Sequence, residues 1–576
     1  MSKILGYENM LRMFGGFLVS WYRRLLSGLK RQRRSRRMFH QDLVRSADAF
    51  AGVFGDWETC TPKVLFFSPR SWVIHQAWEY TLARAVALRG AAVKMVFCDR
   101  AMPCCEAITL ERWHRRESTC ADCAESCRHL LEVAGLPSVS LRDHVSPDLK
   151  RDLEQEVRSL SATEVIDYAR HGDPPLGELL KVPLRRFFRS SEVSFDDSRS
   201  VEVAREFLLA GLMARYGARE LIENFRPDVV FLLNGRFAPE AVFLHEARRA
   251  GVRAVTYERG FCEDTILVDI DRPSVDYQVF DQMWPSWKNV PLNSAQEKDL
   301  EAQLAQRFQG TDGAQSIYWP EIQTLSAVEV RESLGLQPGR PFSAMFPNIT
   351  WDTATQGRDV GFDGLADWIV ETVKLFEARP DRDLVIRCHP AEIRLGRLAS
   401  RESVGQILAG AFPEGMPDNV KVISPESTIS SYSLGAVADQ ILVYASTLGM
   451  EFSTQGKRVL VAGRVHYRGR GFTFDVGNRE SYGELIDSSL ESVLPDDFEQ
   501  QARRYAHMFF FGAMIPIRAV AEFGEADEVE KPSSKTHVRL RYRVPDDLAV
   551  GVDPDLDRLC DSIARGVPAV QMEPNH

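Results

Sequence analysis

Short apolar runs, each bounded by polar or glycine-containing turns, recur along the chain in two separate groups. The first group predicts buried strands at 63–68, 89–99, 227–235 and 251–260. The second group predicts strands at 340–348, 383–390, 419–424, 440–444 and 457–463. Helical periodicity fills the gaps, as at 75–89, 239–250 and 368–378. Strands that are apolar throughout and alternate with helices are typical of parallel sheets covered on both faces.

The two groups of strands predict an α/β protein with two Rossmann-like parallel-sheet domains that face each other across a cleft. A chain of 576 residues is also too long for a single hydrophobic core. Ligands of parallel sheets bind at the carboxyl ends of the strands, so we expect the functional site in the cleft. The predicted units are a basic amphipathic segment (1–40), a first domain (60–290) with a cysteine-rich insertion (98–127), a linker with a connecting helix (291–339), a second domain (340–524) and a tail (525–576).

Charge separates the first 40 residues from the rest of the chain. They hold ten Lys and Arg residues and a single acid, Glu8, although the whole chain has a net charge of −10. The remainder is therefore strongly acidic, which argues against general nucleic-acid binding. Within the basic segment, Phe14, Phe17 and Trp21 recur at helical spacing before a polybasic run at 30–37. This pattern suits either an in-plane helix on an anionic membrane surface or a solvated basic tail.

The apolar run in the basic segment, Met13 to Trp21, is too short to cross a bilayer and is not followed by a small-residue cleavage site. No other stretch suggests a membrane span or an export signal. We therefore expect a cytoplasmic protein that contacts the inner face of the membrane, if at all, through residues 1–40.

Cysteines are concentrated in the insertion that interrupts the first domain. Of the ten in the chain, six lie between 98 and 127. Thiolates bind zinc tetrahedrally, and the pair Cys120 and Cys123 has the spacing of one half of such a site. Cys98 with Cys104 or Cys105 would supply the other half. Four protein ligands leave no open coordination position, so we expect a structural zinc and no catalytic metal; an iron–sulfur cluster and unliganded thiols are the alternatives.

The strands are followed by neither a Gly-x-Gly-x-x-Gly turn nor a Walker loop, which disfavours NAD and P-loop nucleotide sites. Polar groups instead follow several strands of the second group. RCHPAE places Arg387 and His389 at a strand end, and VYASTLGMEF places Ser446 and Thr447 before a helix predicted over 448–455 that carries Glu451.

Phosphate binding would suit these groups. Hydroxyl and N–H groups that precede a helix can hold phosphate oxygens, and a carboxylate one turn later could accept the hydroxyls of a ribose. Arg387 or Lys457 could offset the charge of a diphosphate, and His389 could donate to a phosphate oxygen. Each residue also has a structural alternative, such as capping a helix or completing a turn.

At these residues the chain resembles the two-domain, GT-B-type glycosyltransferases of bacterial capsule and surface-polysaccharide biosynthesis. The resemblance runs through FPNITWDTA, DLVIRCHPAE, ISSYSL, VYASTLGMEFSTQGKRVLVAG and HYRGRGFTFD, and covers roughly residues 60 to 520. It implies that the second domain binds the donor nucleotide. The donor-binding residues implied by position are Asn348, Asp352, Arg387, His389, Ser446, Thr447 and Glu451.

The resemblance also implies an acceptor side on the first domain. His75, at the start of the helix after the first strand, is the expected general base, although SPRSWVIH replaces the Gly-rich approach of the family. Glu258 in YERG is the alternative base. A CD…P-x-CE element followed by Cys-x-x-Cys occurs in the family and matches four metal ligands here: Cys98, Cys105, Cys120 and Cys123.

Together these features predict transfer of a sugar from a nucleotide-sugar donor to a surface polysaccharide or a lipid-linked glycan. A sugar-nucleotide epimerase or a glycerophosphotransferase of the same fold is one alternative. A non-catalytic glycan-binding scaffold is the other.

Overall fold

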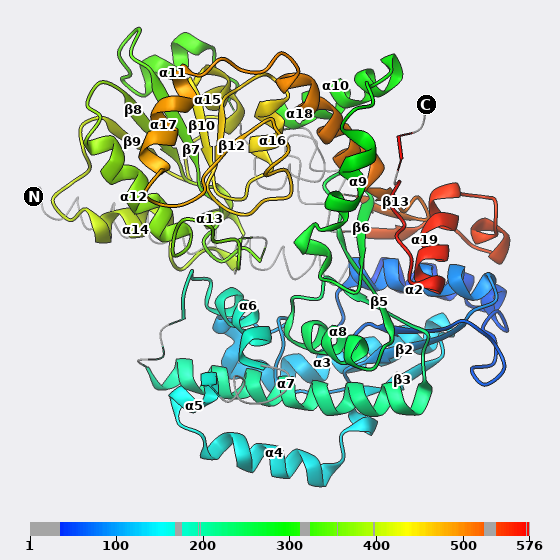
Figure 1. The fold of residues 1–576 in the computed structure, drawn as a ribbon. Helices are drawn as coiled ribbons and strands as arrows, with labels where there is room; N and C mark the ends of the chain where they lie inside the picture. The colour runs from blue at the N-terminus through cyan, green and yellow to red at the C-terminus, as the bar shows by residue number, and fades with distance from the viewer. Residues whose placement is uncertain are drawn as a thin grey trace, which may run out of the picture.

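The computed structural model describes residues 35–167, 176–310, 323–523 and 537–574, apart from 194, 196, 354, 396, 397 and 572. The chain forms two lobes, each built on one sheet with helices on its faces (Figure 1). The predicted α/β architecture with two Rossmann-like domains is confirmed.

The first sheet has seven strands in the order β13-β6-β5-β4-β1-β2-β3. Five of them run parallel: β1 (Lys63–Phe67), β2 (Ala92–Phe97), β3 (Ser138–Ser140), β4 (Val229–Leu233) and β5 (Arg253–Arg259). β6 (Thr265–Ile270) is antiparallel to β5, and β13 (Ile515–Pro516) is antiparallel to β6.

Alternation of side chains across β1 builds two cores, one on each face of this sheet. Val64 and Phe66 pack with α2 (Val73–Leu88) and α19 (Pro554–Arg565) on one face. Leu65 and Phe67 pack with α7 (Ser198–Phe225) and α8 (Ala238–Arg249) on the other. Both faces are therefore covered, as parallel sheets require.

The second sheet has six parallel strands in the order β12-β11-β10-β7-β8-β9. The strands are β7 (Phe342–Phe346), β8 (Asp383–Arg387), β9 (Val420–Ile423), β10 (Gln440–Val443), β11 (Val459–Val461) and β12 (Phe474–Asp475). The remaining helices are α3 (Arg116–Ala134), α4 (Pro147–Ser159), α5 (Ala162–Asp167), α6 (Leu176–Phe188), α9 (Val279–Trp287), α10 (Ser294–Phe308), α11 (Ala327–Ser333), α12 (Leu365–Glu377), α13 (Ala391–Arg394), α14 (Val404–Ala411), α15 (Ser431–Val437), α16 (Leu448–Ser453), α17 (Tyr482–Glu491) and α18 (Phe498–His507). A π-helix, Met508–Gly512, continues α18, and a hairpin of β14 (Val520–Phe523) and β15 (His537–Leu540) follows β13.

The predicted boundary at 524 is wrong, because the chain returns to the first domain before that residue. β13 joins the edge of the first sheet, and α19 lies beside α2 (Figure 1). Cys560 and Ile563 of α19 are fully buried in the core of the first domain. The predicted tail, 525–576, is thus not a separate unit where it is described: its apolar helix face completes the core around β1.

The predicted N-terminal segment, 1–40, also extends into folded structure. Residues 1–34 lie outside the described residues, but 35–47 are helical. Phe39 and Leu43 are buried in the first core, and the buried Asp42 accepts hydrogen bonds from Arg539 Nε at 2.7 Å and from the Leu540 N–H at 3.0 Å. None of the helices in the described part of the chain is long and apolar enough to cross a membrane.

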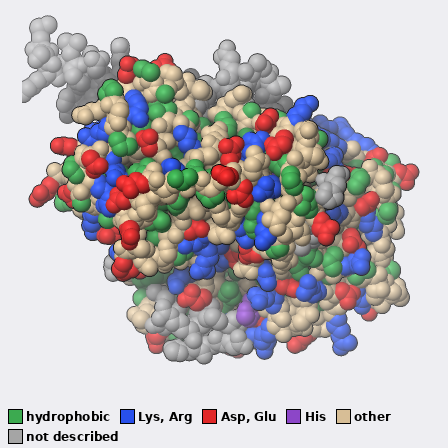
Figure 2. Space-filling view, turned by 45° about the horizontal axis from the view of Figure 1, so that its top comes forward, with side chains coloured by type: hydrophobic (Ala, Val, Ile, Leu, Met, Phe, Trp, Pro, Cys, Tyr) green, Lys and Arg blue, Asp and Glu red, His purple; other side chains and the backbone are tan. Residues whose placement is uncertain are grey.

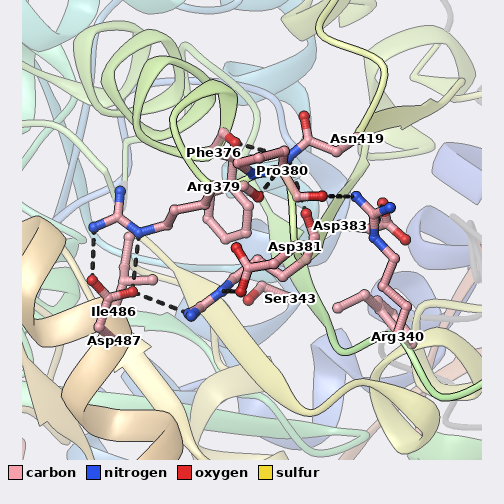
Figure 3. A network of polar contacts seen from close by, with 12 residues as sticks. Arg340, Ser343, Phe376, Arg379, Pro380, Asp381, Asp383, Asn419, Ile486 and Asp487 are labelled. Atoms are coloured by element: carbon pink, nitrogen blue, oxygen red, sulfur yellow. Dashed lines mark hydrogen bonds and ion pairs between the residues drawn. The ribbon is translucent and has the colours of Figure 1, made fainter.

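A polar network ties together the amino ends of the second sheet, opposite its carboxyl edge (Figure 3). Arg379 binds both carboxylate oxygens of Asp487, at 3.0 and 2.9 Å. Asn419, just before β9, donates to the carbonyls of Phe376 at 2.7 Å and Arg379 at 3.0 Å. Bidentate and multiple bonds of this kind fix the geometry of this edge of the sheet. On the face shown in Figure 2, acidic and basic side chains are intermixed.

Candidate active site

A cavity of about 170 Å³ lies at the carboxyl edge of the second sheet, where this edge meets loops of the first domain. The loops after β7, β8 and β10 form most of its wall, and Phe261 and Tyr277 close it from the side of the first domain. Six of the seven predicted donor-binding residues line it: Asn348, Asp352, Arg387, His389, Ser446 and Thr447. Residues up to 99 positions apart in sequence therefore come together because parallel strands end at one edge.

His389 is fixed as a hydrogen-bond donor toward its surroundings. Its Nδ1 accepts the N–H of Ala391 at 3.1 Å, so in the neutral ring the proton is on Nε2. Burial, with a further contribution from the Arg387 charge, lowers the pKa of His389 to about 4. The neutral imidazole can thus donate to a phosphate oxygen without adding positive charge.

Asn348 and Ser446 shape the loop at the end of β10. Asn348 Oδ1 accepts the N–H of Ala445 at 3.1 Å, and Ser446 Oγ accepts the N–H of Leu448 at 3.3 Å. The helix that follows is shorter than predicted and ends at Ser453. With only six residues this helix contributes little dipole at the cavity.

Arg387 lines the cavity, and its guanidinium is held by backbone groups of the protein. Its guanidinium is buried and donates to four backbone carbonyls, those of Cys388, Ser424, Ser427 and Ile429, at 2.7 to 3.2 Å. Arg387 therefore fixes the loops after β8 and β9 around the cavity. Lys457 Nζ donates to the carbonyl of Ala438 at 3.2 Å and lies outside the cavity wall.

Glu451 is the predicted donor-binding residue that does not line the cavity. Its carboxylate is fully buried, with Oε1 at 2.9 Å from Arg307 Nε and Oε2 at 2.7 Å from the Tyr432 hydroxyl. Tyr432 itself lines the cavity. Glu451 thus lies one layer behind the wall and reaches a ligand in this arrangement only through Tyr432.

His75, which is half-buried, lies in a chain of hydrogen bonds in the first domain. Its Nδ1 is 3.2 Å from the Tyr257 hydroxyl, which donates to Glu79 Oε1 at 2.7 Å. The hydroxyl of Ser68 donates to the other oxygen of Glu79. Burial lowers the pKa of His75 to about 3 and raises that of Glu79 to about 7. The ring is available as a neutral base, but His75 is not part of the cavity wall.

The charge of Glu258 acts on Tyr277, a residue of the cavity wall. Asn234 Nδ2 donates to Glu258 Oε2 at 2.9 Å, and the Arg259 N–H donates to Oε1 at 2.8 Å. Burial raises the pKa of Glu258. The pKa of the cavity residue Tyr277 is raised by burial and then by the charges of Asp352 and Glu258, so these two carboxylates, one from each domain, lie near the same phenol.

Arg186 is a functional candidate that the sequence did not reveal. Burial lowers its pKa, and the charges that act on it are, in decreasing order, those of Glu106, Arg70, Asp352 and Glu258. The Arg186 guanidinium stacks on Phe237 at 5.0 Å and makes no hydrogen bond or ion pair with another described residue. It comes from α6, where sequence alone shows only one more Arg in a Leu- and Arg-rich helix. A cation near the cleft without an ion-pair partner can bind an anion.

The cysteines of the insertion lie at the carboxyl edge of the first sheet. Cys98 follows β2, whereas Cys120 and Cys123 lie on α3. The Ser71 N–H donates to Cys123 Sγ at 3.3 Å. Hydrogen bonding from Cys127 lowers the pKa of Cys123 to about 6, whereas burial raises that of Cys120 to about 12.

All ten cysteines are free thiols. Among the described residues, no three Cys, His, Asp or Glu side chains are arranged to hold a metal ion. The described residues therefore lend no support to the predicted zinc or iron–sulfur site at Cys98, Cys105, Cys120 and Cys123. A salt bridge lies at the same edge of the sheet: the buried Arg70 binds Glu240 Oε1 at 2.6 Å.

Comparison with known proteins gives structural likenesses only. No protein-family model matches the sequence, and no curated protein matches it. The similar solved structures include a KpsC beta Kdo 2,4 transferase of Thermosulfurimonas dismutans, with 16% identity over 48% of this chain and 79% of that one, at a TM-score of 0.32. They also include the glycosyltransferase SnogD of Streptomyces nogalater (14%, 78% and 95%, TM-score 0.23) and a UDP-GlcNAc 2-epimerase of Neisseria meningitidis (12%, 77% and 95%, TM-score 0.24).

Proposed function

We propose that this chain is a glycosyltransferase that moves a sugar from a nucleotide-sugar donor to a surface polysaccharide or a lipid-linked glycan. The observation that carries the proposal is the position of the cavity. It lies between the carboxyl edge of one Rossmann-like sheet and loops of a second, and six residues proposed for the donor line it. This is where a donor bound to one domain can meet an acceptor bound to the other.

Different residues around the cavity would take different roles in such a reaction. His389 and the hydroxyls of Ser446 and Thr447 would bind the phosphates of the donor. Arg186 would offset the charge that develops on the leaving diphosphate. Glu258 would take the proton from the acceptor hydroxyl as it attacks, because its raised pKa favours proton uptake and it lies near the cavity residue Tyr277. His75 is the alternative base.

Calorimetry with UDP, CMP and GDP, followed by their sugar derivatives, tests the proposal. We expect one nucleotide to bind saturably, and His389→Ala and Thr447→Val to weaken that binding at least tenfold. Lys457→Ala is the matched control, because Lys457 belongs to the same sequence motif but lies outside the cavity wall. If no nucleotide or nucleotide sugar binds the wild type, the transferase proposal fails and the glycan-binding scaffold gains support.

Product analysis then separates transfer from epimerisation. A transferase leaves the nucleotide sugar intact until an acceptor glycan is added and then releases the free nucleotide. An epimerase converts the sugar in the absence of any acceptor. We expect the first result; conversion without acceptor would favour the epimerase alternative.

We also propose that the basic N-terminal segment contacts anionic membranes. The proposal rests on its charge and apolar spacing, since residues 1–34 lie outside the described residues. The structure improves the test, because the truncation must stop before the helix at 35–47, whose Phe39 and Leu43 belong to the core. Removing residues 1–33 should release the protein from anionic vesicles without changing nucleotide binding. Equal sedimentation of both forms would exclude this contact.

A further inference from the structure

His466 lines the cavity on the side that the first domain closes, and its tautomer is fixed. The hydroxyl of Tyr505 donates its single proton to the carbonyl of His466 at 2.8 Å. The ring Nδ1 of His466 lies 3.1 Å from the same hydroxyl. Because that hydroxyl has no second proton, Nδ1 must donate to it, and Nε2 is left as an acceptor. His389 has the opposite arrangement, with its proton on Nε2.

The Nε2 atom of His466 is buried and has no hydrogen-bond partner among the described residues. The side chain is 8% exposed, and its ring stacks on Phe509 with centroids 4.5 Å apart and planes at 6°. Tyr277 meets it edge-on at 5.3 Å. The ring is thus held in place with an unsatisfied acceptor. Since a buried polar atom without a partner destabilises the folded state, such an atom on a residue that lines a cavity is a candidate for a hydrogen bond to a ligand.

We infer that His466 is a specificity-determining residue whose Nε2 accepts a hydrogen bond from a hydroxyl group of the transferred sugar. The inference rests on the proposed function. His466 lies beside Phe261 and Tyr277, on the wall nearest the first domain, whereas the proposed phosphate-binding groups lie at the ends of β8 and β10. The part of the donor that faces the first domain is the part that is transferred.

The chemistry of the site favours a hydroxyl over a charged group at this position. A bare ring nitrogen repels carboxylate and phosphate oxygens, so neither can bind there without a proton. The aromatic rings of Phe261 and Tyr277 offer apolar surface for the C–H face of a sugar ring. A deoxy sugar that lacks the hydroxyl would leave Nε2 without a partner.

Paired calorimetry tests the inference with the nucleotide sugar found in the screen above and with its parent nucleotide. His466→Phe keeps an aromatic ring against Phe509 but removes the acceptor. We expect this variant to bind the nucleotide sugar roughly five- to tenfold more weakly, and the parent nucleotide within twofold of wild type. An equal loss for both ligands, or no loss for either, would overturn the inference. If the wild type binds neither ligand, it is the proposed function that fails.

Two controls keep the test decisive. His507→Phe changes another buried histidine with an unpartnered ring nitrogen, 6% exposed, that does not line the cavity, and binding should not change. Deoxy analogues of the donor sugar test the wild type itself, in case His466→Phe fails to fold. One analogue should bind the wild type several-fold more weakly than the parent sugar, and should bind a folded His466→Phe variant as well as the parent sugar does. If every single-deoxy analogue binds the wild type as tightly as the parent, the inference is wrong.

Discussion

Arg307 and Glu451 form an ion pair in which neither side chain is exposed to solvent, with Arg307 Nη2 2.7 Å from Glu451 Oε1. Arg307 comes from α10, inside the predicted linker, and Glu451 from α16, behind the cavity wall. Arg307 also donates to the carbonyl of Phe261 at 3.2 Å. The pair therefore joins the connecting helix, the second domain and a first-domain loop that lines the cavity.

Breaking this pair should be costly, whereas replacing it whole should not. Arg307→Met leaves a buried carboxylate without its cation, and we expect a loss of about 3–5 kcal/mol in urea denaturation. The double variant Arg307→Met with Glu451→Gln should recover much of the loss, because no unpaired charge remains. Lys374→Ala, at an exposed pair with Glu371, should change stability by less than about 1 kcal/mol. A double variant no more stable than Arg307→Met alone would contradict this account.

Glu392 should make the stability of the second domain depend on pH. The residue is 1% exposed, its Oε1 accepts the Val404 N–H at 3.0 Å, and its Oε2 has no hydrogen-bond partner among the described residues. Burial raises the pKa of Glu392 from 4.5 to about 7. In that window the folded state keeps a proton that the unfolded state has lost. The contribution of Glu392 to stability therefore falls as pH rises from 4.5 to 7, and stays low above 7.

Glu392→Gln removes this penalty while keeping an oxygen for the Val404 N–H. The variant should be more stable than wild type at pH 8, by an amount on the order of 2 kcal/mol, and indistinguishable from it near pH 4. Thermal unfolding at both pH values measures the difference. The exposed Glu484→Gln controls for the loss of a carboxylate. A gain at pH 4 that disappears at pH 8 would reverse the sign and refute the account.

The sequence predicted the strands of the second sheet well because β7, β8 and β10 are buried throughout and are therefore mostly apolar. It could not predict β12 and β13, because strands of two residues exist only through pairing with distant partners. The return of the chain to the first domain did leave a signal. Leu556, Leu559 and Ile563 form an apolar stripe at helical spacing, which is typical of a helix packed on a core.

For the site, the sequence predicted the location better than the roles. Strand-end loops identified six cavity residues, because chain order and parallel topology bring such loops together. The roles of Arg387 and Glu451 depend on partners that local sequence does not reveal: backbone carbonyls for one and Arg307, 144 positions away, for the other. Arg186 lies in no recognisable motif, and His466 opens the stretch HYRGRGFTFD, which suggested no role for it. Their importance comes from what surrounds them in space.

The choice between the two candidate bases can be made by kinetics. We expect Glu258→Gln to lower kcat about 100-fold or more while donor binding stays within twofold, because a base acts on the acceptor and not on the donor. His75→Gln should lower kcat less than tenfold. Since burial raises the pKa of Glu258, the acid limb of the wild-type pH–rate profile should lie above the usual range of a glutamate. The reverse ranking of the two variants would make His75 the base.

Arg186 should contribute electrostatically to donor binding. Arg186→Gln should weaken binding of the nucleotide sugar about tenfold at low salt and less at about 0.5 M salt, since screening reduces the contribution of the lost charge. Arg186→Lys should keep part of the affinity, because it retains the charge but not the planar fork. Lys181→Gln removes an exposed cation from the same helix and should have no effect. Calorimetry at two salt concentrations measures all four proteins, and equal losses at both concentrations would exclude a charge effect.

Gly449, directly after the cavity residue Leu448, should not tolerate a side chain because there is no room for one. A Cβ at this position would lie 2.1 Å from the Tyr467 hydroxyl and 3.0 Å from Val443 Cγ2. That hydroxyl donates to the carbonyl of Ser446 at 2.6 Å, so moving Tyr467 also moves the loop proposed to bind phosphate. We expect Gly449→Ala to destabilise the protein by about 1–3 kcal/mol and to weaken nucleotide binding in the folded fraction.

The matched control for Gly449 is Gly410, a helical glycine on α14 where a Cβ would meet no atom within 4 Å. Gly410→Ala should leave nucleotide binding unchanged and raise stability by up to about 1 kcal/mol, because alanine loses less backbone freedom than glycine when a helix forms. Urea denaturation and calorimetry on both variants separate the two effects. If Gly449→Ala folds with wild-type stability but still fails to bind nucleotide, the loss of binding comes from a changed loop conformation and not from disrupted core packing. If it binds as wild type does, the contact between Gly449 and Tyr467 does not position Ser446, and the proposed phosphate site loses its structural support.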